Sequence, residues 1–325
     1  MNWGVIGHEW AVRLLRGHII HDSVRHAYLL VGPRSIGRRT MALRFTQALN
    51  CLDPSAPGEP CRVCRACEQV ERMQHPDLLI VQAEDQGSTL RVDQVRELQH
   101  DLALSPYQSA YKVAVLLRFE EANLSAANAL LKTLEEPSPR VVLILTAESE
   151  ELLLPTIVSR CETLHLQPVP LEDLAEALRA LLDISADKAE FLAHVSNGRP
   201  GYALRLHQEP GYLGARQDWL DVHSEVLSAN RVKRFAIANT LAKNRSEMID
   251  ALTIWLSFWR DVFLKASGAA VPIANIDRSA EIEQLAGQLG FKNASQAVID
   301  VEQIMNLLNR NINSRLALEA VSYTH

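Results

Sequence analysis

Four of the five cysteines lie close together in the chain and could bind a metal ion. They are Cys51, Cys61, Cys64 and Cys67, with the spacing C-x9-C-x2-C-x2-C. A C-x2-C turn places two thiolates on one ion, and zinc prefers four such ligands in a tetrahedron. The set contains no histidine and leaves no ligand position open. We therefore expect a structural zinc rather than a catalytic one.

Other uses of these cysteines stay open at this point. An iron–sulfur cluster is also held by four thiolates, and a redox dithiol could use one C-x2-C pair. A zinc module can also bind nucleic acid, which would require a basic surface around it. Arg62 and Arg65 favour that use, whereas Glu59, Glu68 and Glu71 oppose it.

A second candidate site is a glycine-containing loop between an expected strand and an expected helix. Gly32 and Gly37 match the phosphate-binding pattern G-x-x-x-x-G-K-[ST]. Arg38 stands where a lysine reaches the outer phosphates, and Arg39 stands where a hydroxyl binds magnesium. Thr40 comes one residue late, which turns its hydroxyl by about 100° around the helix. The backbone N–H groups of such a loop could still hold an anion.

The acidic half of an ATPase site is also missing from its usual place. Acidic residues at the end of a buried strand bind magnesium and help to position the attacking water. Here the strand expected over 112–117 ends at Leu117 and Arg118. Glu120 and Glu121 are displaced, and we expect them to begin the next helix, where its dipole favours them. Because both halves have lost magnesium ligands, we expect no ATP hydrolysis at this site.

The elements that would position these residues alternate between strands and helices over 1–166. Such alternation predicts a parallel sheet covered by helices on both faces. The expected strands are 26–31, 78–81, 112–117 and 141–146, and the clearest helices are 40–50, 92–103 and 125–134.

The strand signals end near residue 166, after which the pattern is helical. Three short helices are expected over 167–212, at 171–182, 188–196 and 202–208, ending at Pro210-Gly211. The remainder, 213–325, is expected to be a helical domain with breaks at 268–272 and 287–290. Its aromatic residues are expected mainly to fill its own core, and they are Trp219, Trp255, Phe258, Trp259 and Phe263.

Composition limits the class of protein. A length of 325 residues favours about two domains, with three possible. The apolar share of 47% and the charged share of 22% are typical of globular chains. A net charge of −6 gives no overall basic field for nucleic acid. The sequence contains no apolar run long enough for a membrane and no signal-peptide pattern, so we expect a cytoplasmic protein.

Several segments resemble the clamp-loader subunits of bacterial DNA polymerase III, the gamma, tau and delta-prime family of the AAA+ superfamily. The most specific are 126–137 (AANALLKTLEEP) and the triplet Ser159-Arg160-Cys161. The others are Gly7-His8, 26–30, the four-cysteine insert, 91–98, 154–157, Asn311, Asn313 and 315–319. Gamma and tau hydrolyse ATP, whereas delta-prime is often degraded at both halves of the site. This sequence resembles the degraded member.

The resemblance implies three domains: an α/β AAA+ nucleotide-binding fold over 1–166 with a zinc module at 51–67, a three-helix lid over 167–212, and a helical collar over 213–325. The collar would join five subunits in a ring. Implied partners are gamma/tau-type ATPase subunits, the delta subunit, and, through the complex, the sliding clamp and primer-template DNA. The implied role is to help open the clamp and place it on primed DNA, with ATP bound to neighbouring subunits.

Arg160 receives a role only from this resemblance, which implies an arginine finger that reaches the γ-phosphate of ATP on the adjacent subunit. On sequence alone it would be a surface arginine in a local ion pair, such as one with Glu162. Cys161 is then expected to be a small buried residue that supports the turn, and not a metal ligand. The alternative for the whole chain is an active gamma/tau-type ATPase with an atypical phosphate loop.

Overall fold

The computed structural model describes residues 3–84 and 88–309, and it confirms the fold class expected from the sequence. Contacts divide the chain into two compact units. One contains Met1–Ala177 and Gly198–Gly201, and the other contains Leu178–Asn197 and Tyr202–His325. The finer division into three domains remains a prediction.

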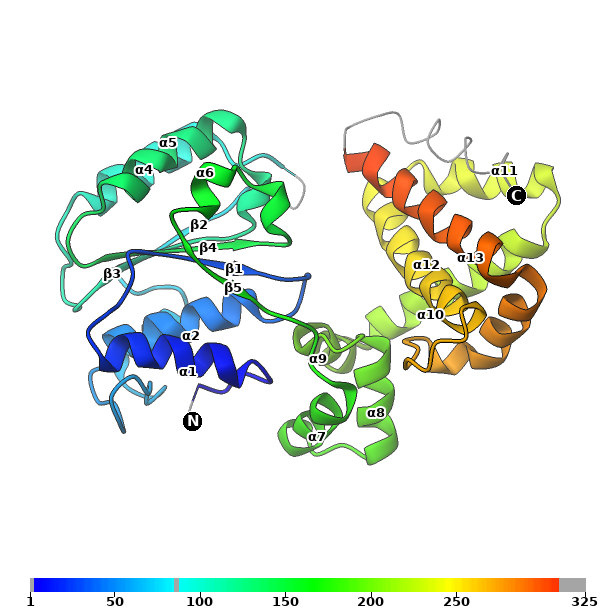
Figure 1. The fold of residues 1–325 in the computed structure, drawn as a ribbon, viewed down its shortest axis with the longest axis horizontal. Coiled ribbons are helices and arrows are strands. Elements are labelled where there is room, and N and C mark those ends of the chain that lie inside the picture. Colours follow the sequence, from blue (N-terminus) through cyan, green and yellow to red (C-terminus); the bar gives the residue numbers. More distant parts are fainter. Residues whose placement is uncertain (1–2, 85–87, 310–325) are drawn as a thin grey trace. The chain divides into compact units, whose positions relative to one another are not determined.

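The first unit is built on a parallel sheet of five strands in the order β2-β3-β4-β1-β5 (Figure 1). The strands are β1 (Ala27–Val31), β2 (Leu78–Val81), β3 (Lys112–Leu116), β4 (Val141–Ala147) and β5 (Glu162–His165). All residues of β1, β3 and β4 are buried, as expected for strands that are covered on both faces. The four predicted strands are confirmed.

Helices cover both faces of this sheet (Figure 1). One face carries α1 (Glu9–Ile20) and α2 (Arg38–Asn50), and the other carries α4 (Val92–Leu102), α5 (Leu124–Glu135) and α6 (Pro155–Val158). Successive residues of β1 point to opposite faces. Tyr28 therefore packs in the cluster with Phe45 of α2, whereas Leu29 packs in the cluster with Leu130 of α5.

From Leu171 onward the described helices are α7 (Leu171–Leu182), α8 (Ala186–Val195), α9 (Pro200–Gln208), α10 (Pro210–Ser228), α11 (Arg231–Leu241), α12 (Arg245–Ala266) and α13 (Ser279–Asn309). The break expected at Pro210-Gly211 lies one residue earlier, at Glu209, between α9 and α10. Pro210 is the first residue of α10, because a fixed φ and a missing N–H suit the first helical turn. The break expected at 268–272 is confirmed, and the one at 287–290 is a kink at Gly290 inside α13.

The core of the second unit is aromatic and aliphatic. Trp255, Phe258 and Trp259 are buried, while Trp219 and Phe263 are partly buried against the same cluster. These aromatic residues fill the core of their own unit, as expected.

Two further observations concern the C-terminal residues and the possibility of a membrane-spanning helix. The C-terminal residues that resemble the family, Asn311, Asn313 and 315–319, lie outside the described residues. Within 3–84 and 88–309, every helix is too short or too polar to span a membrane.

Candidate functional site

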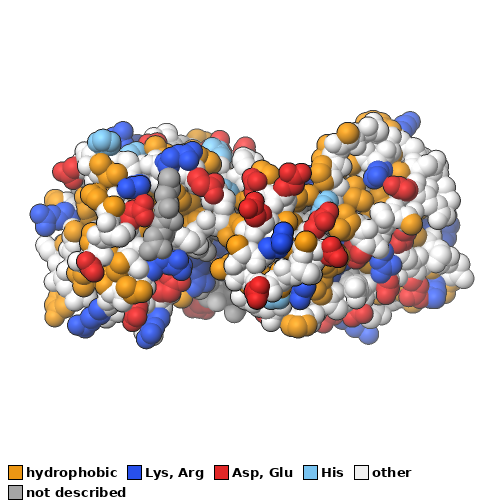
Figure 2. All heavy atoms as spheres, turned by 90° about the horizontal axis from the view of Figure 1, so that it is seen from below, with side chains coloured by type: hydrophobic (Ala, Val, Ile, Leu, Met, Phe, Trp, Pro, Cys, Tyr) orange, Lys and Arg blue, Asp and Glu red, His pale blue; other side chains and the backbone are white. Residues whose placement is uncertain are grey.

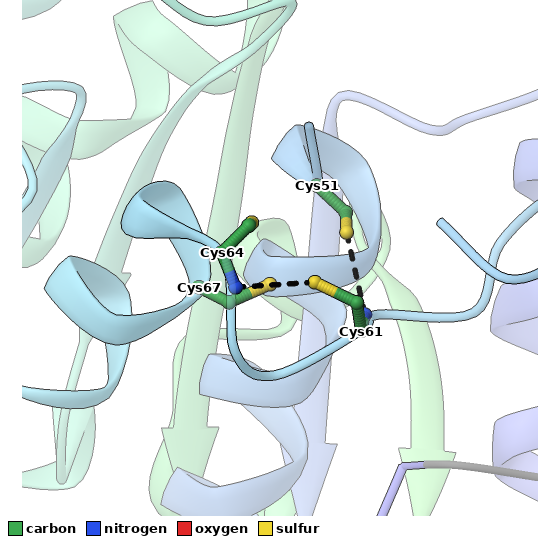
Figure 3. A group of neighbouring side chains, drawn as sticks. All are labelled: Cys51, Cys61, Cys64 and Cys67. Atoms are coloured by element: carbon green, nitrogen blue, oxygen red, sulfur yellow. Dashed lines mark hydrogen bonds between the residues drawn. The ribbon is translucent and has the colours of Figure 1, made fainter. Parts of the chain in front are cut away.

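The four cysteines of the predicted zinc site come together in space, and Figure 3 shows their side chains converging. Their four Sγ atoms all lie within 4.8 Å of one another. Cys51 directly follows α2, and Cys67 lies on α3 (Arg65–Glu71). Zn–S bonds of about 2.3 Å in a tetrahedron place the sulfurs about 3.8 Å apart, so the donor set fits one ion. In the described part of the chain, no other group of histidine, cysteine or acidic residues meets the same criterion.

Backbone N–H groups point at these sulfurs. Cys61 N donates to Cys51 Sγ and Cys64 N donates to Cys61 Sγ, each at 3.3 Å (Figure 3). Burial alone would raise the pKa of Cys64, but N–H donors from Cys67 and Leu52 lower it to about 6. Burial raises the pKa of Cys51 and of Cys67. Because all four sulfurs converge, the arrangement favours a metal centre over a redox dithiol that uses one pair.

The module is fixed to the helix that follows the phosphate loop. Arg44 of α2 forms an ion pair with Glu71 of α3, and Gln47 Nε2 donates to Cys67 O at 2.7 Å. Both Arg44 and Gln47 are buried. The cysteine cluster and the loop are therefore held by the two ends of the same helix.

The predicted phosphate loop lies between β1 and α2, as expected. Gly37 precedes α2 with a φ of 114°, a conformation that favours glycine. A Cβ on Gly32 would lie 2.4 Å from the backbone oxygen of Leu166, so this position also requires glycine. Arg39 and Thr40 are exposed, and Arg39 Nη2 contacts Met73 Sδ at 2.7 Å. The backbone of the loop thus requires glycine at both positions, whereas the side chains of Arg39 and Thr40 are exposed.

The remaining loop arginines face carboxylates of the same chain. Arg34 forms an ion pair with Glu148, which follows β4. Burial would lower the pKa of Arg34, but the hydrogen bond and charge of Glu148 raise it. Arg38 is only 8% exposed, and burial lowers its pKa despite the nearby charge of Glu120. Burial likewise raises the pKa of Glu120. Arg34 is therefore already paired within the protein, and Arg38 is buried near the charge of Glu120.

The displaced acidic residues do not begin the next helix, so that expectation is wrong. Glu120 and Glu121 belong to a short 3-10 turn, and α5 begins later, at Leu124. Asn123 caps α5, because its Oδ1 accepts a hydrogen bond from Ala126 N at 2.8 Å. Glu121 instead forms an ion pair with Arg118 at 3.0 Å.

Next to the loop lies an acidic hollow of about 260 Å³, at the carboxyl ends of β1, β4 and β5. Gly32 and Pro33 line one part of it. Its acidic lining residues are Glu148, Glu150 and Glu151. Carboxylates in this place repel a polyphosphate, so the hollow is poorly suited to the phosphates of a nucleotide.

The sequence did not predict that the first turn of α9 packs against the loop at Ser35. Gly201 N, in the first turn of α9, donates to Ser35 O at 2.9 Å. A Cβ on Gly201 would lie 2.8 Å from the same oxygen. On a different element, His8 Nε2 lies 3.3 Å from Ile36 O. Protein atoms thus satisfy backbone carbonyl groups of the loop from two directions.

Arg160 lies between α6 and β5, and its side chain is 35% exposed. Its Nη2 donates to Glu135 Oε1 at 2.7 Å, and its Nη1 donates to Thr156 O at 2.9 Å. The ion pair expected with Glu162 is therefore wrong. The segment that contains Glu135 was conspicuous in the sequence, but nothing in the pattern connected this residue to Arg160.

Cys161, next to Arg160, is partly buried and lies outside the cysteine cluster. Burial raises the pKa of its thiol to about 12. It packs against the hydrophobic cluster around α5 and α6. These properties suit a residue that supports the turn.

Comparisons with known proteins agree with this architecture. A family model described as "DNA polymerase III, delta subunit" matches residues 7–170, and "DNA polymerase III, delta subunit, C terminal" matches residues 215–321. The chain is 34% identical to DNA polymerase III subunit delta' of Pseudomonas aeruginosa, over 91% of this chain and 90% of that protein. It is 28% identical to subunit delta' of Bacillus subtilis, over 95% of this chain and 93% of that protein.

Among solved structures, the chain aligns with a DNA polymerase III gamma subunit-related protein from Thermotoga maritima. The alignment has a TM-score of 0.46 at 19% identity and covers 96% of this chain and 97% of that one.

The five-stranded parallel sheet, the helices that cover it and the helical remainder define a chain of the AAA+ class. Within that class, the chain belongs to the delta-prime family of bacterial DNA polymerase III subunits, as the sequence segments indicated.

Proposed function

We propose that this chain is a delta-prime-type clamp-loader subunit that does not hydrolyse ATP and that supplies Arg160 to the ATP site of a neighbouring subunit. The observation that carries the proposal is a contrast within one unit. In its own loop, Arg34 is paired with Glu148 and Arg38 is buried. The side chain of Arg160 is 35% exposed, and its bonds to Glu135 and to Thr156 O use two of its five N–H donors. We propose that the chain keeps the fold of an ATPase but lacks the residues that would bind magnesium at its own site.

The chemistry of this role follows from phosphoryl transfer. Negative charge is spread over the oxygens of the transferred γ-phosphoryl group in the transition state. A guanidinium is planar and always protonated, and it can donate two parallel hydrogen bonds. In related phosphoryl-transfer enzymes an arginine finger accelerates hydrolysis by roughly 10³- to 10⁵-fold. Arg160 would act on one of several sites in the complex, so the effect on total turnover is smaller.

The family supports the remaining parts of the proposal. We assign 1–166 to the nucleotide-binding fold, 167–212 to the lid and 213–325 to the collar. The collar joins gamma/tau-type ATPase subunits and a delta subunit in a ring. The assembled complex opens the sliding clamp and places it on primed DNA. Relatives named delta', tau and gamma support these partners.

For the metal, we propose a structural zinc ion held by Cys51, Cys61, Cys64 and Cys67. The ion would join the loop that carries Cys61 and Cys64 to α2 and α3, so that its binding energy contributes to local folding. The site has four protein donors for a tetrahedral ion, which leaves no position for substrate.

An independent nucleic-acid-binding role for the zinc module has little support. Arg62 and Arg65 are exposed beside the cluster, but Glu68 is exposed there as well, and Glu59 forms an ion pair with Arg16 at 3.1 Å. On the face drawn in Figure 2, basic and acidic side chains are interspersed. Because the chain belongs to the polymerase subunit family, we favour the clamp-loader role over an independent nucleic-acid-binding role.

The test is a reconstituted clamp loader that carries Arg160→Ala. We expect normal assembly, but slower hydrolysis when DNA and clamp are present, and less clamp loading. Arg25→Ala is the matched control, since Arg25 is another exposed arginine of the same unit. Unchanged hydrolysis and loading in Arg160→Ala would refute the arginine-finger role. Turnover of ATP by the purified chain alone would instead support an active gamma/tau-type ATPase.

A further inference from the structure

We infer that Glu135 is a positioning residue for Arg160, holding its guanidinium in place before the neighbouring nucleotide arrives. This inference rests on the proposed function of Arg160. It is carried by a contact between two separate elements: Glu135 is the last residue of α5, and Arg160 follows α6.

The contact holds both terminal nitrogens of the guanidinium. Nη2 donates to Glu135 Oε1 at 2.7 Å, and Nη1 donates to Thr156 O at 2.9 Å. A guanidinium has five N–H donors, and these two bonds use two of them. The side chain is thus oriented at two points while other donors stay available for an incoming phosphate oxygen.

The position of Glu135 at the C-terminus of α5 indicates that its negative charge serves the contact with Arg160. The negative end of a helix dipole lies at the C-terminus, where a carboxylate is unfavourable. Glu135 occupies the last position of α5, and the next residue, Glu136, is acidic as well. The guanidinium of Arg160 compensates this local negative charge. An acid at this position is therefore explained by its contact with Arg160 better than by the stability of α5.

The strength of the Glu135–Arg160 ion pair determines whether Glu135 orients Arg160 for the neighbouring nucleotide or prevents Arg160 from reaching it. The side chains are 35% and 52% exposed, and ion pairs this exposed shift an equilibrium by about fivefold or less. A polyphosphate carries several charges and competes easily with such a pair. The contact is therefore too weak to lock Arg160 away, but it is strong enough to narrow the orientations of a long and flexible side chain.

The experiment uses the complete reconstituted complex, with kcat and KM for ATP measured in the presence of DNA and clamp. We expect Glu135→Ala to slow the site that Arg160 serves by roughly two- to fivefold and to leave KM unchanged. The kcat of the whole complex should fall by less than this, and by no more than in Arg160→Ala, because the other sites are unaffected. Glu135→Gln should lose less of kcat than Glu135→Ala, because its amide oxygen can still accept from Nη2. Glu136→Ala is the matched control and should behave as the wild type, since this acid shares the helix end but not the contact.

Combined variants and assembly measurements separate the outcomes. In an Arg160→Ala background, adding Glu135→Ala should cause no further loss, because both changes remove the same interaction. A Glu135→Ala complex that assembles and turns over at the wild-type rate or faster overturns the inference. So does an equal loss in Glu136→Ala, or a further loss in the Arg160→Ala background. These results leave the arginine finger intact, whereas an Arg160→Ala complex with normal hydrolysis refutes both.

Discussion

Arg44 on α2 and Glu71 on α3 join the helix of the phosphate loop to the cysteine module. Arg44 Nη2 donates to Glu71 Oε1 at 3.2 Å, and Arg44 Nη1 contacts the other carboxylate oxygen. The Arg44 side chain is 7% exposed, whereas that of Glu71 is 51% exposed. Burial would raise the pKa of Glu71, but the hydrogen bond and charge of Arg44 lower it. The ionised form of Glu71 is therefore the one that stabilises the folded module.

Replacing Glu71 with alanine should lower the free energy of unfolding by about 1–2 kcal/mol, because it leaves the buried Arg44 without its countercharge. The half-exposed position of Glu71 keeps the cost below that of a fully buried pair. Glu68→Ala is the control. Its pair with Arg72 is exposed and 4.0 Å long, so we expect a loss of less than about 0.5 kcal/mol. Urea unfolding of both variants measures the difference.

The same pair predicts a dependence on pH. The folded pKa of Glu71 lies below its ordinary value of 4.5, so its contribution is present above that pH and is lost as the pH falls through the folded pKa. The stability difference between the wild type and Glu71→Ala should therefore shrink below pH 4.5. A difference that stays constant down to pH 3 would show that the charge of Glu71 is irrelevant.

Cys64→Ser should lose the bound zinc and loosen residues 51–67, since one of four thiolate donors is removed. Elemental analysis of the purified protein measures the metal, and limited proteolysis measures the loosening. Cys161→Ser is the matched control and should keep the metal, because Cys161 lies outside the cluster. Wild-type protein that contains no zinc, or that contains iron instead, would contradict the assignment. In the assembled complex, Cys64→Ser should lower DNA- and clamp-stimulated ATP hydrolysis by a much smaller fraction than it lowers the metal content.

Restoring the lost loop residues should not restore nucleotide binding. We expect the double variant Arg38→Lys and Arg39→Thr to resemble the wild type, with no magnesium-dependent binding of ATP at micromolar concentrations. The reason is that Leu117 and Arg118 still occupy the acidic positions, and the adjoining hollow is still lined by carboxylates. Calorimetric titration with ATP, with and without magnesium, measures this, using an intact tau subunit as positive control. Tight magnesium-dependent binding by the double variant but not by the wild type would show that the loop alone decides binding.

His223 gives the second unit a sensitivity to acid. Its ring lies 4.9 Å from that of Phe258 and 5.4 Å from those of Trp255 and Trp259. Burial lowers its pKa from 6.5 to about 4. The folded state therefore keeps His223 neutral, while the unfolded chain takes up a proton below pH 6.5, so stability is lost as the pH falls from 6.5 towards 4.

Compared with His223→Gln, the wild type should lose up to roughly 3 kcal/mol more stability between pH 7 and pH 4. Glutamine stays neutral over this range, so the other titrating groups contribute equally to both proteins. Chemical unfolding at several pH values gives the difference. A gap between the two proteins that does not vary with pH would contradict the assignment.

The features that could be predicted from the sequence are those specified by neighbouring residues. Apolar runs identified β1, β3 and β4 because these strands are buried on both faces. The segment Glu162–His165 gave no such signal, since β5 lies at the edge of the sheet and, of its four residues, Leu164 alone is buried. The cysteine cluster was predictable because three of its ligands lie within seven residues, from Cys61 to Cys67.

Contacts between distant residues could not be predicted in this way. Glu135 meets Arg160 only because α5 and α6 pack on the same face of the sheet, and local sequence favoured Glu162 as the partner. The contact of Gly201 with Ser35 depends in the same way on how the chain returns to the loop. Glu120 and Glu121 were assigned to the wrong element because Asn123, a better cap, begins α5 after them.

The parallel sheet has a consequence for synthesis of the chain. No two of its strands form a hairpin, and Leu29 of β1 pairs with Leu145 of β4 and Thr163 of β5. Ribosomes add about 5–20 residues per second, so β1 waits on the order of ten seconds for β4 and β5 to emerge. During this interval an apolar strand has no partner, and nascent-chain chaperones have time to bind it. The helical C-terminal part is translated last and relies on more local contacts, so we expect it to fold soon after it leaves the ribosome.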